Sequence, residues 1–165
     1  MEALKELKAL LAHEVQMMHS AENILLAGLP LIIEKASNEE LKAVLDMHWK
    51  ETGMQVKRLE KAAEYLHISA SGNQNPGMKG LLTESEKLTQ QEGAEPLVDT
   101  ALIVGMQKIE HYEIASYGTA AYLADELGLT EVADLLRETL LEERNTSSIL
   151  GQIAQKNIIR QAAKV

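Results

Sequence analysis

The chain has 165 residues, which favours a single domain with a hydrophobic core of its own. It contains no cysteine, which excludes disulfides, thiolate zinc sites, iron–sulfur clusters and thiol catalysis. Its formal net charge of -9 argues against a general nucleic-acid binder, which needs a basic surface, and is compatible with the attraction of cations.

The first predicted helix spans residues 2–35, where apolar residues recur in steps of three and four and Glu22 lies within their stripe. Gly28 and Pro30 are expected to kink or break this helix near its end. Its amphipathic, partly acidic start does not resemble a signal or transit peptide. No apolar run of the chain approaches the roughly 20 residues of a membrane span. We therefore expect a cytoplasmic protein with neither membrane nor nucleic-acid partners.

The second predicted helix spans residues 38–66, with Ser37 or Asn38 as its cap. Three polar residues interrupt its apolar stripe, namely His48, Glu51 and Gln55. A loop rich in Ser, Gly and Asn follows at residues 69–77, and a short helix is predicted over residues 78–91. The long connection that contains this short helix favours ferritin-like connectivity over a simple up-down-up-down bundle.

The third long helix is predicted over residues 96–127, and its stripe contains Glu110, Glu113 and Tyr117. Gly128 is expected to end this helix.

Thr130 is expected to cap the fourth long helix, over residues 130–155, which contains Glu142 and Glu143. The tail after Gly151 either continues this helix or bends into a fifth, and it is a candidate dimer contact.

An internal repeat relates the two halves of the chain. A shift of 91 residues aligns Glu22 with Glu113 and Glu51 with Glu142, without gaps. Several apolar positions coincide as well. This spacing predicts two related helix hairpins about a pseudo-twofold axis, with one carboxylate from each long helix in the interior.

Four helices that each direct carboxylates into one core are able to hold a dinuclear metal site, because an unpaired buried carboxylate is otherwise costly. Iron and manganese prefer carboxylate oxygens with some imidazole nitrogen. A lone glutamate in a helical stripe is more often a solvated edge residue, but four coincident stripes favour the metal site. The candidate ligands are Glu22, Glu51, Glu110, Glu113, Glu142 and Glu143. Candidates for contact with these ligands are His48, Gln55, His19 and Tyr117.

Several segments resemble the YciF/YciE-type stress-response family, a ferritin-like domain of unknown function. They are SAEN around Glu22, HWKETGMQVKRLE around Glu51, QKIEHYEIASYGT around Glu110 and Glu113, and LLRETLLEER around Glu142. The resemblance covers almost the whole chain. It implies a ferritin-like four-helix bundle with an added short helix, a homodimer, and a rubrerythrin-like dimetal site. Two positions weaken the ligand set that the resemblance implies: many members have His or Gln at position 55, where this chain has Gln, and Asp is common one turn after the final glutamate pair, where this chain has Ser147.

The resulting functional hypothesis is a stress-response protein that holds two iron or manganese ions and reduces peroxide or oxygen. The sequence does not identify an electron donor, because the cysteine-rich electron-transfer domain attached to some rubrerythrin-like proteins is absent. Neither helix that would supply a Glu-x-x-His pair has that order. The alternative is therefore a non-catalytic helical stress or interaction protein with a degenerate metal site.

Overall fold

The computed structural model describes residues 6–90 and 93–165. Its helices are α1 (Leu7–Lys35), α2 (Glu39–Leu66), α3 (Pro76–Thr89), α4 (Glu95–Glu126), α5 (Thr130–Ile153), the π-helix η1 (Ala154–Ile158) and α6 (Ile159–Ala162). The described residues contain no strand. The all-α fold class expected from the sequence is confirmed.

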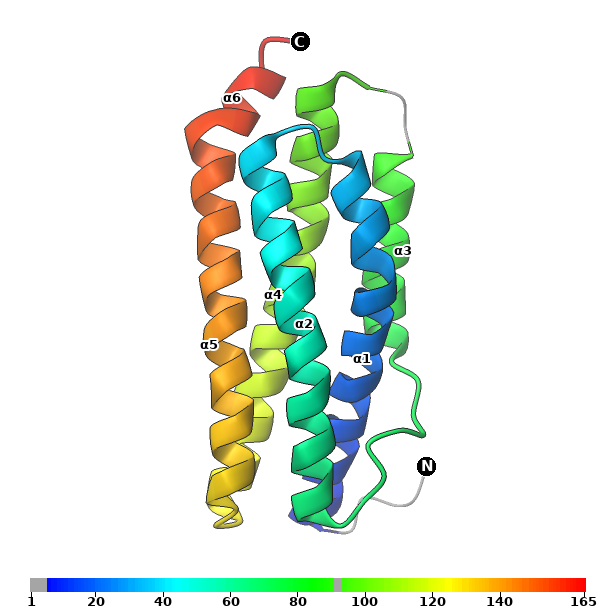
Figure 1. The fold of residues 1–165 in the computed structure, drawn as a ribbon, viewed down its shortest axis with the longest axis vertical. Coiled ribbons are helices and arrows are strands. Elements are labelled where there is room, and N and C mark those ends of the chain that lie inside the picture. The colour runs from blue at the N-terminus through cyan, green and yellow to red at the C-terminus, as the bar shows by residue number, and fades with distance from the viewer. Residues whose placement is uncertain (1–5, 91–92) are drawn as a thin grey trace.

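The chain direction defines a ferritin-like bundle with one long crossover (Figure 1). In the view of Figure 1 the chain ascends in α1, descends in α2, ascends in α3, descends in α4 and ascends in α5. The helices α2 and α4 are therefore parallel, and α3 returns the chain along the outside of α1 and α4. The α1–α2 and α4–α5 pairs form two antiparallel hairpins, as the internal repeat predicts.

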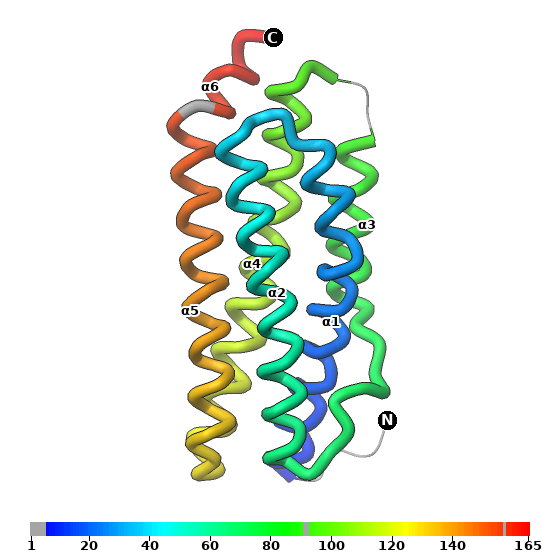
Figure 2. The backbone as a smooth tube through the Cα atoms, viewed as in Figure 1, coloured from blue at the N-terminus to red at the C-terminus, as the bar shows by residue number. Residues whose placement is uncertain are grey.

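The helix ends differ from the predictions in specific ways. Residues 2–5 of the first predicted helix and Gln91 of the predicted short helix lie outside the described residues. Asn38, and not Ser37, caps α2, because its side chain accepts a hydrogen bond from the amide of Leu41 at 3.0 Å. Thr130 is the first residue of α5 and not its cap. The chain after Gly151 continues α5 and then bends through η1 into α6, as the tube in Figure 2 shows.

Of the kink or break expected near Pro30, the break is absent, since α1 continues to Lys35. A proline in a helix leaves the carbonyl four residues earlier without its usual partner. Here that carbonyl belongs to Leu26, and the indole Nε1 of Trp49 on α2 donates to it at 3.1 Å. The side chain of Trp49 therefore satisfies the acceptor that Pro30 leaves free.

The core lies between the four long helices and is built from their apolar stripes. Its largest fully buried apolar side chains are Leu11, Met18, Leu25, Leu29, Leu41, Leu45, Leu59, Leu102, Met106 and Ile109. Buried polar groups interrupt these stripes at mid-height, in the region of Glu22, His48, Glu113 and Glu143. Among the described helices, none combines the length and apolar character that spanning a membrane requires.

The crossover helix α3 packs closely against the bundle through small residues. Asn75 is buried, caps α3 by accepting from the amide of Met78 at 2.8 Å, and donates to the hydroxyl of Tyr112 at 2.9 Å. At the other end, Gly105 of α4 faces Ser85 of α3 so closely that an added Cβ would lie 2.2 Å from the serine Oγ. The contact between α3 and α4 thus depends on the absence of a side chain at residue 105.

Substitution of Gly105 by alanine is expected to destabilise the protein by about 2 kcal/mol, because overpacking outweighs the gain in helix propensity of about 1 kcal/mol. Urea denaturation measures the change. Gly80→Ala on the exposed side of α3 is the control, since nothing lies within 4 Å of its added Cβ, and it should stabilise slightly. Adding Ser85→Gly to Gly105→Ala should recover part of the loss. Equal stabilities for Gly105→Ala and Gly80→Ala would contradict this packing.

Candidate metal centre

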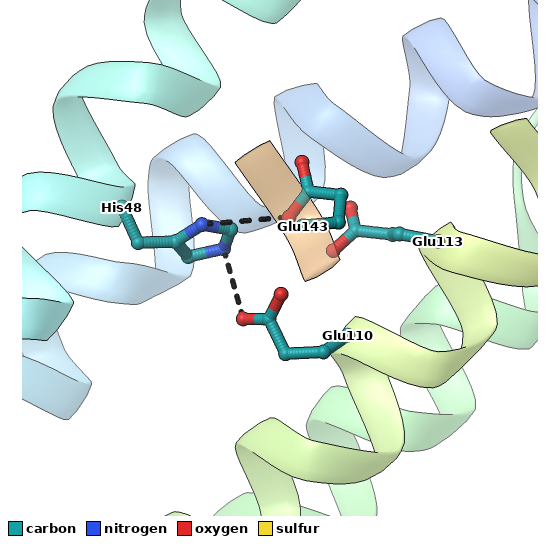
Figure 3. Close-up of side chains that lie close together, drawn as sticks. All are labelled: His48, Glu110, Glu113 and Glu143. Atoms are coloured by element: carbon teal, nitrogen blue, oxygen red, sulfur yellow. Dashed lines mark ion pairs between the residues drawn. The ribbon is translucent and has the colours of Figure 1, made fainter. Parts of the chain in front are cut away.

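Four buried side chains from three helices meet at the centre of the bundle. They are His48 of α2, Glu110 and Glu113 of α4, and Glu143 of α5, and each offers one donor atom within 4.8 Å of all the others. Figure 3 shows the three glutamate side chains on one side of the imidazole ring, with dashed lines that join Glu110 and Glu143 to it. Imidazole and carboxylate together form a donor set that suits iron, manganese or zinc.

The helical repeat explains why these side chains meet. Glu110 and Glu113 are three residues apart and therefore share one face of α4. His48 lies one turn before Thr52, whose hydroxyl donates to the carbonyl of His48 at 2.8 Å. This local bond satisfies the threonine within its own helix, so Thr52 does not compete for the buried carboxylates.

His48 lies between two carboxylates without a hydrogen bond to either. Its Nε2 is 3.6 Å from an oxygen of Glu110 and its Nδ1 is 3.7 Å from an oxygen of Glu143 (Figure 3). Burial lowers the pKa of His48 to about 4, and the charge of Glu142 opposes this effect. The ring is therefore neutral near pH 7, which is the state that a metal ion requires.

The buried carboxyl groups resist ionisation in the metal-free protein. Burial raises the pKa of Glu143 to about 8, with a further contribution from the charge of Glu142. The pKa of Glu110 and that of Glu113 are raised well above the ordinary value, first by burial and then by neighbouring carboxylates. A cation among these groups would remove both causes, because it would replace the lost hydration and neutralise their charge.

Glu22 reaches the same interior from α1. The hydroxyl of Tyr117 donates a short hydrogen bond to one of its carboxylate oxygens, and the other oxygen is buried without a partner. Burial, and secondarily the charge of Glu143, raise the pKa of Glu22 well above its usual range, although the bond from Tyr117 opposes the shift. Tyr117 is itself fully buried, and it fixes the orientation of the Glu22 carboxylate.

Between α2 and α5 the carboxylates lie beside a positively charged side chain, that of Arg58. Arg58 forms a bidentate pair with Glu142, with nitrogen–oxygen distances of 2.6 and 2.7 Å. The amide of Gln55 donates to Glu142 at 3.0 Å and to Glu143 at 2.5 Å. Glu51 lies half-buried beside this group, and one of its oxygens is buried without a partner.

The unpaired polar atoms test whether this site fits a metal. Buried polar atoms are normally hydrogen-bonded, and each exception needs an explanation. In the described residues all of these exceptions but one belong to the centre of the bundle; the other is the hydroxyl of Ser85, at the contact between α3 and α4. Those at the centre are an oxygen of Glu22, both ring nitrogens of His48, an oxygen of Glu51, the carbonyl oxygen of Gln55, both oxygens of Glu110 and of Glu113, an oxygen of Glu143 and the hydroxyl of Thr146. Most are metal-donor atoms of suitable chemistry, so the residues fit a bound cation.

The structure places the candidate residues from the sequence at different distances from the cluster. Of the candidate ligands, Glu110, Glu113 and Glu143 belong to it, together with His48, which was predicted only to contact the ligands. The structure puts Glu143 in the interior and Glu142 in the ion pair with Arg58, because the buried face of α5 contains Leu136, Leu140 and Glu143.

His19 does not reach this interior. It is hydrogen-bonded to Asn23 and lies 3.8 Å from Glu60 on the outer side of α1 and α2. Arg58 was not among the candidate residues. The available signal was its position one turn after Gln55, on the polar edge of the α2 stripe.

Comparisons with known proteins agree with this architecture. Protein YciF of Escherichia coli (strain K12) is 34% identical over 160 residues, which cover 96% of both chains. The crystal structure of the E. coli stress protein YciF matches with a TM-score of 0.89 and 35% identity, over 93% of this chain and 98% of that one. YcfI from Rhodopseudomonas palustris matches with a TM-score of 0.89 and 31% identity over the same shares. Residues 6–163 match the family described as a domain of unknown function (DUF892), and the chain belongs to this family of YciF-type stress proteins.

Proposed function

We propose that this chain is a ferritin-like dimetal-carboxylate protein of the stress response, which binds iron or manganese. The observation that supports the proposal is the concentration of unpaired, fully buried donor atoms around His48, Glu110, Glu113 and Glu143. A packed apolar core would be at least as stable as a metal-free cluster of this kind, because buried charges without partners are strongly destabilising. A bound metal ion would be the partner that these donor atoms lack.

The residues divide into those that would hold the ions and those that orient them. His48, Glu110, Glu113 and Glu143 would hold one ion, and Glu22 and Glu51 would complete a second position. Tyr117 orients Glu22, and Gln55 orients Glu143. When bound, iron or manganese would supply one-electron redox chemistry toward peroxide or oxygen. The surrounding aliphatic core would keep bulk water away from the ligands.

A second candidate function is supported by the ligands that the site lacks. In diiron bundles, two helices each supply a Glu-x-x-His pair. Here Gln55 and Thr146 lie one turn after the glutamates of α2 and α5, and His48 is the one imidazole in the cluster of the described residues. A non-catalytic helical stress protein with a degenerate metal site would also have this pattern. The two candidates differ in whether the protein binds metal tightly.

Metal analysis of protein purified without chelator separates the two functions. The wild-type protein is expected to contain up to about two ions of iron or manganese per chain. The double variant Glu51→Ala/Glu113→Ala should lose most of this metal. Its matched control is Glu64→Ala/Glu126→Ala, which removes two exposed glutamates from the same two helices.

The outcome for the control variant decides how a loss is interpreted. Control protein with wild-type metal content shows that the interior carboxylates, and not the total charge, hold the ions. Equally negligible metal in the wild type and both variants, even after incubation with Fe²⁺ or Mn²⁺, would contradict the dimetal function. That result would favour the non-catalytic protein.

A further inference from the structure

Between α2 and α5, partly exposed charged side chains lie next to the proposed metal centre. The donor groups His48 and Glu143 are fully buried, whereas Glu142 is 20% exposed and Arg58 is 14% exposed. Glu138, one turn before Glu142, is 60% exposed. The side chains of this edge therefore form a graded polar route from the surface to the buried ligands.

Arg58 controls the position of the outer carboxylates on this route. Its two terminal nitrogens bind both oxygens of Glu142, and one of them also contacts Glu138 at 2.7 Å. The other terminal nitrogen of Arg58 also lies 3.4 Å from the hydroxyl oxygen of Thr139. Two parallel charge-assisted bonds fix a carboxylate in angle as well as in distance. Glu142 is thereby held away from the cluster beside it.

Gln55 transmits this arrangement to a buried ligand. Its amide nitrogen contacts Glu142 at 3.0 Å and Glu143 at 2.5 Å at the same time. Its amide oxygen is buried without a partner. The position of the Gln55 amide therefore depends on the carboxylate that Arg58 holds, and the orientation of Glu143 depends on Gln55.

We propose that Arg58 is a positioning residue that controls the exchange of a divalent cation at this centre. Its ion pair with Glu142, together with the Gln55 bridge to Glu143, closes the edge between α2 and α5, and we name these three residues the Arg58 latch. A cation enters and leaves when the latch opens. Opening frees Glu142, whose carboxylate then offers oxygen ligands between solvent and the cluster. The inference rests on the proposed metal-binding function.

The latch differs from a simple charge effect in its kinetic consequences. Loss of the guanidinium charge alone makes the site more negative, so a cation should bind faster and leave more slowly. Opening a latch removes a common barrier, so both uptake and release accelerate. Measuring the two rates separately distinguishes these cases.

The test uses Co²⁺ as the probe, because its visible absorption reports coordination by carboxylate and imidazole. Stopped-flow mixing gives the uptake rate, and an excess of chelator gives the release rate. Arg58→Met keeps the apolar stem of the side chain and is expected to accelerate both rates about tenfold. Arg58→Lys keeps the charge but loses the bidentate geometry, so its rates should lie between those of the wild type and Arg58→Met.

Arg137→Met is the matched control. Arg137 also pairs with two carboxylates, those of Asp125 and Asp134, at 2.7 and 2.6 Å, but on an exposed surface. Its loss should leave both Co²⁺ rates unchanged. The melting temperatures of the metal-free variants show whether a change in rate follows a general loss of stability.

Three outcomes would overturn the latch. Rates within about twofold of the wild type for Arg58→Met and Arg58→Lys would leave Arg58 with a purely structural role. Faster uptake with slower release would show a charge effect alone. A wild-type protein that takes up no Co²⁺, Fe²⁺ or Mn²⁺ would remove the metal centre itself, and the latch with it. If Arg58→Met does not fold, Arg58→Lys tests the latch by itself, because it keeps the charge: acceleration of both rates supports the latch, and rates within about twofold of the wild type overturn it.

Discussion

Replacement of Glu113 by glutamine is expected to stabilise the metal-free protein at pH 8 and to abolish its stabilisation by metal. The Glu113 side chain is fully buried and neither of its oxygens has a hydrogen-bond partner. Ionising such a group is costly, and glutamine has nearly the same shape without the charge. The expected gain is on the order of 2 kcal/mol, or an increase in melting temperature of roughly 5 °C.

The response to metal should change in the opposite direction. A cation present at 100 times its dissociation constant adds about 2.7 kcal/mol to the stability of a protein that binds it only when folded. Wild-type protein should show an increase of this order with Fe²⁺ under anaerobic conditions or with Mn²⁺. Glu113→Gln lacks one of the clustered carboxylates and should show little increase. Differential scanning calorimetry with and without metal measures both effects.

Glu64→Gln is the control, because Glu64 is exposed on α2. Its stability should change by less than about 0.5 kcal/mol, and its response to metal should match the wild type. A Glu113→Gln protein that is less stable than the wild type at pH 8 would indicate that the Glu113 carboxylate already has a stabilising partner. That result would contradict the interpretation of its unpaired oxygens.

The sequence predicted the architecture because its signals are local. Steps of three and four between apolar residues identify helices, and the long connection after the second helix identifies the crossover. Helix ends were predicted less well. Thr130 resembles a cap but begins α5, and the effect of Pro30 depends on Trp49, which lies on another helix. A contact of this kind is tertiary and leaves no local pattern.

The candidate centre shows the same division between local and tertiary information. Glutamates at positions 22, 110 and 113 lie within clear apolar stripes and are buried in the structure. Glu142 and Glu143 are adjacent, so their directions differ by about 100° on a helix. A rotation of α5 of that size decides which of them is buried, and packing against α4 sets it. The ion pairs of Arg58 could not be predicted, because its partners lie 80 or more residues away in the sequence.

Between pH 6.5 and 8, the metal-free protein is expected to lose stability as the pH rises. An ordinary glutamate has a pKa of 4.5, whereas that of Glu143 is raised to about 8 by burial. The unfolded chain therefore binds fewer protons than the folded protein in this interval. Each carboxyl group with a pKa raised in this way lowers the free energy of unfolding by about 1.4 kcal/mol per pH unit. The pKa of His48 is lowered from 6.5 to about 4, so this residue makes the stability rise with pH, but only below pH 6.5.

Metal should reverse this pH dependence. A bound cation holds the carboxylates in their ionised form, so binding releases protons and becomes tighter as the pH rises. The increase in stability with saturating Mn²⁺ should therefore be larger at pH 8 than at pH 6.5. Urea denaturation at both pH values measures the stabilities, and calorimetric titration in buffers of different ionisation enthalpy measures the released protons.

Metal-free stability that is constant across the interval would show that the folded protein already holds these carboxylates ionised. Glu113→Gln should reduce the slope, because it removes one of the groups with a raised pKa, whereas Glu64→Gln should leave the slope unchanged.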